Sequence, residues 1–155
     1  MWIYRLSGFH VFRLSGLHVY NTNTMSTFER FEDIEAWKEG RKMVKEIRKI
    51  CKRQNVKRDF GFVDQITRAA RSVCANIAEG FESITVMEFI TFLGYARRSA
   101  GEVRSHLYDA LDEEFISNQE FNSLYDQSRK IGCMTAKLIE YLNKIDKSRR
   151  RNQST

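Results

Sequence analysis

Lysine and arginine residues are concentrated between positions 38 and 58 of this 155-residue chain. The interval holds ten basic residues, opposed by two acidic residues, Glu39 and Glu46. Most of the ten recur at helical spacing, so a helix would bring them to one face. A basic face of this kind has the chemistry to bind a phosphate backbone. The basic residues are Lys38, Arg41, Lys42, Lys45, Arg48, Lys49, Lys52, Arg53, Lys57 and Arg58.

A second basic cluster lies near the C-terminus, where Asp146 is the one acidic residue among five basic residues. In an up-down bundle the first and last helices are neighbours, so we expect the two clusters to merge. Acidic residues are segregated too, since the interval from Asp109 to Asp126 holds six of them and no lysine or arginine. The second basic cluster consists of Lys144, Lys147, Arg149, Arg150 and Arg151.

This charge pattern, on a chain with a net charge of +6, leaves more than one interpretation open. The first is binding of RNA or DNA through the phosphate backbone, and the second is a solvated helix face without a ligand. A third is docking between subunits or to an acidic partner, as in a scaffolding oligomer that binds a protein. The first basic interval has no interleaved aromatic residues, so we expect contacts to phosphates with little reading of base sequence.

The chain has no recognisable catalytic signature. It lacks the Glu-x-x-His pairs of di-iron bundle proteins, a P-loop and a Gly-x-Ser-x-Gly motif. His106 stands alone, and we interpret it as a surface or boundary residue rather than a ligand. We therefore expect a protein that is not an enzyme, with no catalytic residue, no metal, no cofactor and no small-molecule substrate.

The cysteines are few and widely spaced. Cys51, Cys74 and Cys133 form no Cys-x-x-Cys pair, which argues against both a zinc site and a disulfide framework. We interpret them as buried, small apolar residues in a reducing compartment. The chain also has no run of about 18 apolar residues, so we expect no membrane span and a cytoplasmic location.

Helical periodicity from residue 28 onward predicts four amphipathic helices. They cover about 33–53, about 60–79, a third from about residue 85 and a fourth after Ser117. Capping boxes of the form Ser/Thr-x-x-Glu, Thr85 with Glu88 and Ser117 with Glu120, mark the starts of the last two helices. The absence of proline and the short connections favour an all-α, antiparallel, up-down-up-down four-helix bundle.

The second predicted helix carries a stripe of small and polar residues beside its apolar seam. Such a stripe permits close packing of another helix, either in the same bundle or in a neighbouring subunit. Glu79 stands in the last turn, where the helix dipole disfavours it, so we expect either an exposed glutamate or a partner among Lys38, Arg41 and Lys144. Gly80 is expected to end the helix. The stripe consists of Ala69, Ser72, Ala75, Asn76 and Glu79.

Residues 1–24 differ from the rest of the chain. They contain two copies of one octapeptide, RLSGFHVF at 5–12 and RLSGLHVY at 13–20. One interpretation is a metal-binding repeat using His10 and His18, and the other is an N-terminal extension outside the native fold, with translation starting at Met25. The order of segments is not that of a signal peptide. We expect a bundle at 25–147 and a basic, flexible tail at 148–155.

Three motifs resemble the bacterial four-helix-bundle family associated with intervening sequences in large-subunit (23S) ribosomal RNA genes. They are FEDIEAWKEGRKMVKEI at the start of the first helix, DQITRAARSVCANIAEGF in the second and EFITFLGYARRSAGEVRSHLYDA in the third. The resemblance covers about residues 28–145. It implies a homopentamer of bundles with no known catalytic activity, related to retroelement accessory proteins that bind nucleic acid through basic surfaces. The chain departs from the family pattern at Cys74, where proline is usual, and at ESITVM after Gly80, where a basic link is usual.

Overall fold

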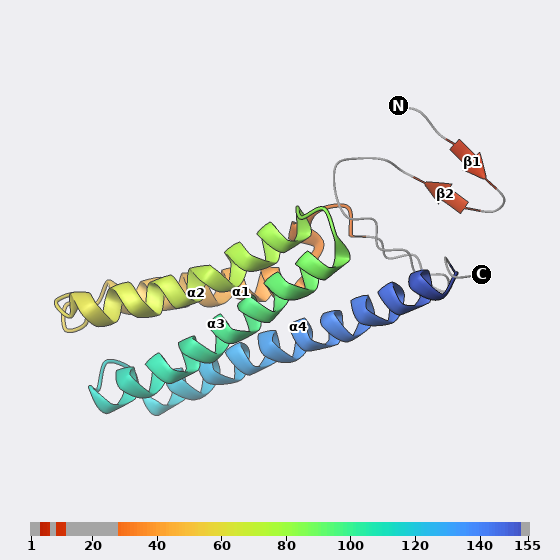
Figure 1. Ribbon diagram of the computed structural model, residues 1–155. Coiled ribbons are helices and arrows are strands. Elements are labelled where there is room, and N and C mark those ends of the chain that lie inside the picture. The colour runs from red at the N-terminus through yellow and green to blue at the C-terminus, as the bar shows by residue number, and fades with distance from the viewer. Residues whose placement is uncertain (1–3, 7–8, 12–27, 153–155) are drawn as a thin grey trace.

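The computed structural model describes residues 4–6, 9–11 and 28–152, and the last of these ranges forms a four-helix bundle (Figure 1). Each helix packs against the next, and the first also packs against the fourth. This arrangement confirms the prediction of an all-α four-helix bundle. The helices are α1 (Glu35–Cys51), α2 (Phe60–Phe81), α3 (Val86–Asp112) and α4 (Asn118–Asn152), and a 3-10 turn, η1 (Phe31–Asp33), precedes them.

The described residues of the first copy of the octapeptide repeat, 5–6 and 9–11, lie in a short antiparallel pair of strands. Strand β1 (Tyr4–Leu6) pairs with β2 (Phe9–Val11), and His10 is opposite Arg5. The second copy, with His18, lies outside the described residues. The assignment of residues 1–24 to an extension outside the native fold stays a prediction.

We expect that deleting residues 1–24 leaves the thermal unfolding midpoint of the bundle unchanged. The seams of α1 to α4 cover one another, and Phe28 and Phe31 already close the core at the start of the bundle. Thermal melts of the full chain and of a chain starting at Met25 would check this. A midpoint lowered by more than a few degrees would show that the repeat packs on the bundle.

Both predicted capping boxes are present. The backbone N–H of Glu88 donates to Thr85 Oγ1 at 3.1 Å, and the backbone N–H of Thr85 donates to Glu88 Oε2 at 3.0 Å. The corresponding distances between Ser117 and Glu120 are 3.2 and 2.9 Å. These bonds satisfy amide groups that have no partner within the helix, and they set where α3 and α4 begin.

The core lies between the apolar faces of the four helices. On α2 the buried residues recur at intervals of three and four, as helical periodicity predicts, and on α4 the fully buried positions include two polar residues, Ser128 and Thr135. Their hydroxyls donate to backbone carbonyls, Ser128 to Ala100 at 2.6 Å and Thr135 to Ile131 at 2.9 Å. Polar groups can therefore occupy core positions without an unsatisfied hydrogen bond. On α3 the fully buried residues include Leu93.

Gly80 does not end α2, contrary to the sequence prediction, because the helix continues to Phe81. Its role is to allow α2 and α3 to approach closely. A Cβ atom at position 80 would lie 2.6 Å from Phe92 Cβ and 2.9 Å from Phe89 Cδ2, which no ordinary packing allows. Gly40 permits a similar approach of α1 to α2, since a Cβ there would lie 2.8 Å from Cys74 Sγ.

The small-residue stripe on α2 is used in part within the bundle. Ala69 is buried, and Ser72 is joined to α3 by a hydrogen bond of 3.0 Å from Ser99 Oγ. The Asn76 amide turns back to its own helix and donates to the Ser72 carbonyl at 2.8 Å. Ala75 and Glu79 are exposed, and no described residue forms an ion pair with Glu79. Of the two expectations for Glu79, the structure shows the exposed glutamate.

The C-terminal end of α1 is tied to the connection between α3 and α4. The Arg53 guanidinium pairs with the Glu120 carboxylate through two nitrogens and also donates to the Phe115 carbonyl at 3.1 Å. Glu120 at the same time closes the capping box with Ser117. These contacts, Arg53 above all, hold the pKa of Glu120 at about 2, well below the ordinary value of 4.5.

This lowered pKa predicts how stability responds to acid. A carboxylate with a depressed pKa in the folded state stabilises above the unfolded pKa, and its contribution disappears as pH falls toward the folded pKa. We therefore expect the stability difference between wild type and Glu120→Gln to shrink between pH 4.5 and about 2. Glutamine keeps the capping box and removes only the charge, and urea unfolding at several pH values would measure the difference.

Glu88→Gln is the matched control, because it makes the same change in a capping box without an arginine partner among the described residues. We expect a smaller pH-dependent difference for this variant. Equal pH dependence for the two variants would show that Arg53 does not stabilise the charged form of Glu120.

Candidate nucleic-acid interface

Four basic residues form a continuous stripe on the solvent side of α1 and of its C-terminal cap. They are exposed, and none of them forms an ion pair with a described residue. Their spacing of four, three and four residues places them along one line of the helix, opposite the buried face. We call this set the basic stripe, and it consists of Arg41, Lys45, Arg48 and Lys52.

The other predicted residues of α1 are already paired with carboxylates. Lys42 Nζ lies 2.8 Å from Glu39 Oε1, and Lys49 Nζ lies 2.8 Å from Glu46 Oε1. Lys38 Nζ similarly lies 2.6 Å from Glu35 Oε1. These lysines add less net positive potential than the basic stripe does.

Arg53 has a structural role in this fold. It is half-buried and occupied by Glu120 and the Phe115 carbonyl, so a phosphate would have to displace those contacts. We therefore leave Arg53 out of the proposed interface, although it belongs to the basic interval 38–58 of the sequence.

Glu39 of α1 contacts α4 and holds Lys130, a basic residue that the sequence prediction did not include, beside α1. Its side chain is largely buried, and Lys130 Nζ of α4 lies 3.5 Å from Glu39 Oε1. Gln127 Nε2 donates to the Glu39 carbonyl at 3.3 Å. The hydrogen bond from Lys42, together with the charge of Lys130, lowers the pKa of Glu39 despite its burial. Lys130 therefore stands beside the basic face of α1.

From Lys130, basic residues continue along α4 at intervals of seven residues, at Lys137, Lys144 and Arg151. Two turns of helix separate each pair, so the residues lie along one line of α4. All four are exposed. The regular spacing of these residues is a signal that could have been found in the sequence. We call this set the α4 line.

The C-terminal cluster extends away from α1 rather than merging with it directly. Because Lys130 lies beside Glu39, Lys144 is about 21 Å further along α4 by the helical rise. Figure 1 shows the last turns of α4 extending beyond the connection between α2 and α3. The α4 line joins the two clusters.

Within the C-terminal cluster the residues differ in their surroundings. Lys144 and Lys147 are exposed, and Arg150 Nε lies 2.9 Å from Asp146 Oδ2. The side chain of Arg149 lies outside the described part of the structure. Helix α4 continues to Asn152, so residues 148–152, expected to form a flexible tail, are helical.

This face exposes little aromatic ring surface, as the sequence predicted. Trp37 is half-buried, and the Arg41 guanidinium covers its ring with 5.2 Å to the ring centre. A base that stacked on the face covered by Arg41 would have to displace that guanidinium. The face can therefore contact phosphates, whereas it offers little to bases.

The structure also shows the surroundings of the cysteines, of His106 and of the acidic interval. Cys51 is buried and Cys74 is half-buried, but Cys133 is exposed, so the prediction of three buried cysteines is wrong for that residue. His106 is a boundary residue whose Nδ1 lies 3.2 Å from Asp109 Oδ2. Most of the acidic interval from Asp109 to Asp126 is exposed at the α3–α4 end of the bundle.

Two absences hold for the described residues. No three histidine, cysteine, aspartate or glutamate side chains among them converge in a way that could hold a metal ion. None of the helices described combines the length and the apolarity needed to cross a membrane.

The fold and its charged face define a small helical-bundle protein with a basic surface. A family model described as 23S rRNA-intervening sequence protein matches residues 32–137, and the chain belongs to this family. The resemblance inferred from the three motifs is thereby confirmed.

A solved structure shares the fold. It is a protein with unknown function from the S23 ribosomal protein family of Bacteroides thetaiotaomicron, 23% identical, with a TM-score of 0.61. The match covers 67% of this chain and 97% of that one, and at this identity it supports the fold alone. No curated protein matches the chain.

Proposed function

We propose that this protein is a non-enzymatic bundle that binds the phosphate backbone of duplex RNA or DNA through the basic stripe and the α4 line. The observation that carries the proposal is the row of four exposed basic residues along α1 and at its C-cap, none of which forms an ion pair with a described residue. A cation that already has a carboxylate partner gains less from a phosphate than a cation without one, and neutralising phosphates releases condensed counterions.

The proposed contacts select for charge and shape rather than base sequence. Phosphate contacts fix the position of a protein on a duplex but carry no sequence information. The family's description associates its members with 23S rRNA intervening sequences, which makes structured RNA the first ligand to test.

The test is a salt titration of binding by the full chain to structured RNA, duplex DNA and polyglutamate. We expect both nucleic acids to bind, with affinities that fall steeply between about 50 and 200 mM salt. Polyglutamate serves as the control for charge without phosphate. Equal binding to polyglutamate would contradict the proposal and favour docking to an acidic protein.

We also propose that the bundle assembles into a homo-oligomer, with the pentamer of the resembled family as the expected form. Ala75 and Glu79, the exposed part of the α2 stripe, are available for contact with another subunit. Light scattering would measure the mass, and a monomer at tens of micromolar would exclude this assembly.

The second candidate function is a scaffold for a protein partner. It is favoured by exposed apolar residues near the connection between α2 and α3, where Ile84 is 93% and Met87 45% exposed. Apolar side chains exposed together often mark an interaction surface. Substituting both with serine would weaken protein docking, whereas the proposed phosphate contacts would be unaffected.

A further inference from the structure

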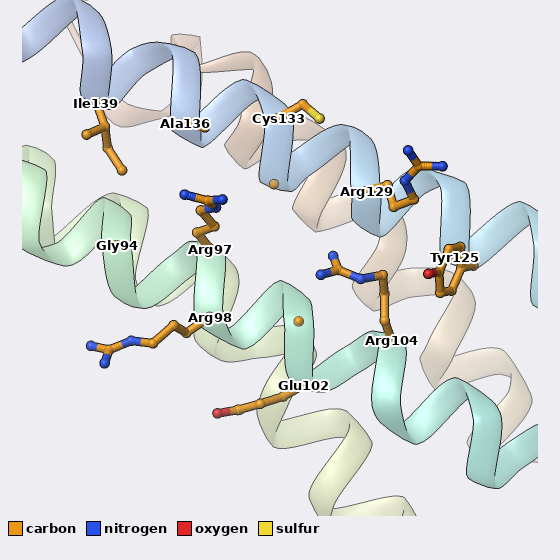
Figure 2. A pocket seen from close by; sticks show the side chains of 12 residues that line it. Gly94, Arg97, Arg98, Glu102, Arg104, Tyr125, Arg129, Cys133, Ala136 and Ile139 are labelled. Carbon is orange, nitrogen blue, oxygen red and sulfur yellow. The ribbon is translucent and has the colours of Figure 1, made fainter.

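A groove of about 910 Å³ lies between α3 and α4, away from the basic stripe (Figure 2). Four arginines line it, three from α3 and one from α4, together with one acidic residue, Glu102. Sequence periodicity could not reveal this groove, because its lining comes from two helices that meet only in the folded chain. The four arginines are Arg97, Arg98, Arg104 and Arg129.

Three glycines keep the groove open. A Cβ atom at Gly94 would meet nothing within 4 Å, in contrast to Gly40 and Gly80, where glycine permits close helix packing. At Gly101 the nearest atom would be Arg104 Nη2 at 3.7 Å, and at Gly132 it would be Arg104 Nη1 at 3.9 Å. The Arg104 guanidinium thus occupies space that the missing side chains of both helices leave free.

Glu102 is the one carboxylate that lines the groove, so among the described residues the lining carries more positive than negative charge. Figure 2 shows Arg97 and Arg104 extending from α3 toward α4, whereas Glu102 points away from α4. Neither of these arginines, nor Arg129, forms an ion pair with a described residue. A guanidinium presents parallel N–H donors that match a phosphate, so these groups are suited to a phosphodiester chain.

Aromatic rings adjoin one end of the groove, which distinguishes it from the basic stripe. Tyr125 lines the groove and stacks on Phe121, with ring centres 5.4 Å apart. Tyr108 lies against both rings, 4.9 Å from Phe121 and 6.0 Å from Tyr125, and is 51% exposed. Exposed aromatic faces beside cationic groups are the combination that binds single strands, because bases stack on the rings.

We propose that the α3–α4 groove binds a single-stranded segment of RNA or DNA. Arg97, Arg104 and Arg129 contact its phosphates, and the ring of Tyr108 or Tyr125 stacks on a base. A duplex is too wide to enter, because the axes of packed helices are about 8–10 Å apart. This site is separate from the basic stripe, and single-strand binding in the groove does not depend on duplex binding by the stripe.

The first test compares fluorescently labelled oligo(dT) with a labelled duplex. The groove variant is Arg97→Gln with Arg104→Gln and Arg129→Gln, and the stripe variant is Lys45→Gln with Arg48→Gln and Lys52→Gln. Each removes three positive charges, so each controls for the other. We expect the groove variant to bind oligo(dT) at least tenfold more weakly and the duplex unchanged, with the reverse pattern for the stripe variant.

Two further variants test base stacking and the open space of the groove without changing the charge. Tyr108→Ala removes an exposed ring, and loss of one stacked base corresponds to roughly a 5- to 150-fold loss of affinity for oligo(dT). Gly132→Leu fills the groove beside Arg104 without changing the charge, and its Cβ has room. We expect both to retain duplex binding, and a normal thermal melt would establish that each variant is folded.

Alkylation of Cys133 locates the bound strand. This thiol is exposed in the groove, whereas Cys51 is buried and burial raises the pKa of the Cys74 thiol to about 11. We expect oligo(dT) to slow alkylation of Cys133 and a duplex to leave its rate unchanged.

Two results would overturn the proposal. One is a folded groove variant that binds oligo(dT) as tightly as wild type. The other is a change in the mass of the assembly on filling Gly132, with single-strand binding retained, which would assign the groove to contact with a second copy of this chain.

Discussion

Gly80→Ala is expected to lower the free energy of unfolding by about 1–3 kcal/mol, the usual range for forcing extra atoms into a packed core. The added Cβ would lie 2.6 Å from Phe92 Cβ, an atom fixed to the backbone of α3. The two helices must then move apart, and the edge-on packing of Phe81 against Phe89 would be disturbed as well. Urea unfolding monitored by helical circular dichroism would measure the loss.

Gly94→Ala is the matched control for this substitution. It lies on α3, where a Cβ would meet nothing within 4 Å, so alanine should stabilise the helix by about 0.5–1 kcal/mol. The two changes are chemically identical, and their opposite signs would come from packing alone. A Gly80→Ala variant as stable as wild type would show that α2 and α3 are not as close as described.

Replacing Lys45, Arg48 and Lys52 together with glutamine is expected to weaken duplex binding about 100-fold at low salt, because three phosphate contacts and their released counterions are lost. The affected residues are exposed and form no ion pair with a described residue. Stability should change by no more than about 0.5 kcal/mol per substitution. Fluorescence anisotropy with several unrelated duplex sequences would measure affinity, and the loss should be similar for all of them.

The control variant replaces two lysines that already pair with carboxylates. Lys42→Gln with Lys49→Gln removes charges held at 2.8 Å from Glu39 and Glu46, and we expect a smaller loss per charge than for the basic stripe. If both variants lose the same affinity per charge, the ion pairs of α1 do not decide which residues bind.

Local patterns were enough to predict most of the fold. Apolar spacing predicted the four helices, and Ser117 and Thr85 were found as helix caps because a capping box involves residues three positions apart. Gly80 was misinterpreted for a physical reason. A glycine near a helix end fits both a C-terminal cap and a close helix contact, and the contact depends on Phe89 and Phe92 of another helix.

The candidate site was predictable only as a set of charges. The sequence shows that α1 is basic, but it does not show which lysines pair with Glu39 and Glu46 and which remain available. The sequence does not distinguish Arg53 from the neighbouring basic residues, whereas in the structure Arg53 pairs with Glu120. Lys130 joins the face because α4 packs beside α1, and that contact spans most of the chain.

The salt dependence of duplex binding, measured side by side for wild type and the Lys45, Arg48 and Lys52 variant, tests the proposed function most directly. Each phosphate contact contributes a slope of about −0.9 to the plot of log affinity against log salt. The proposal predicts a slope shallower by roughly two to three units for the variant, at unchanged stability. An identical slope and affinity would contradict it, and would show that the basic stripe is a solvated helix face.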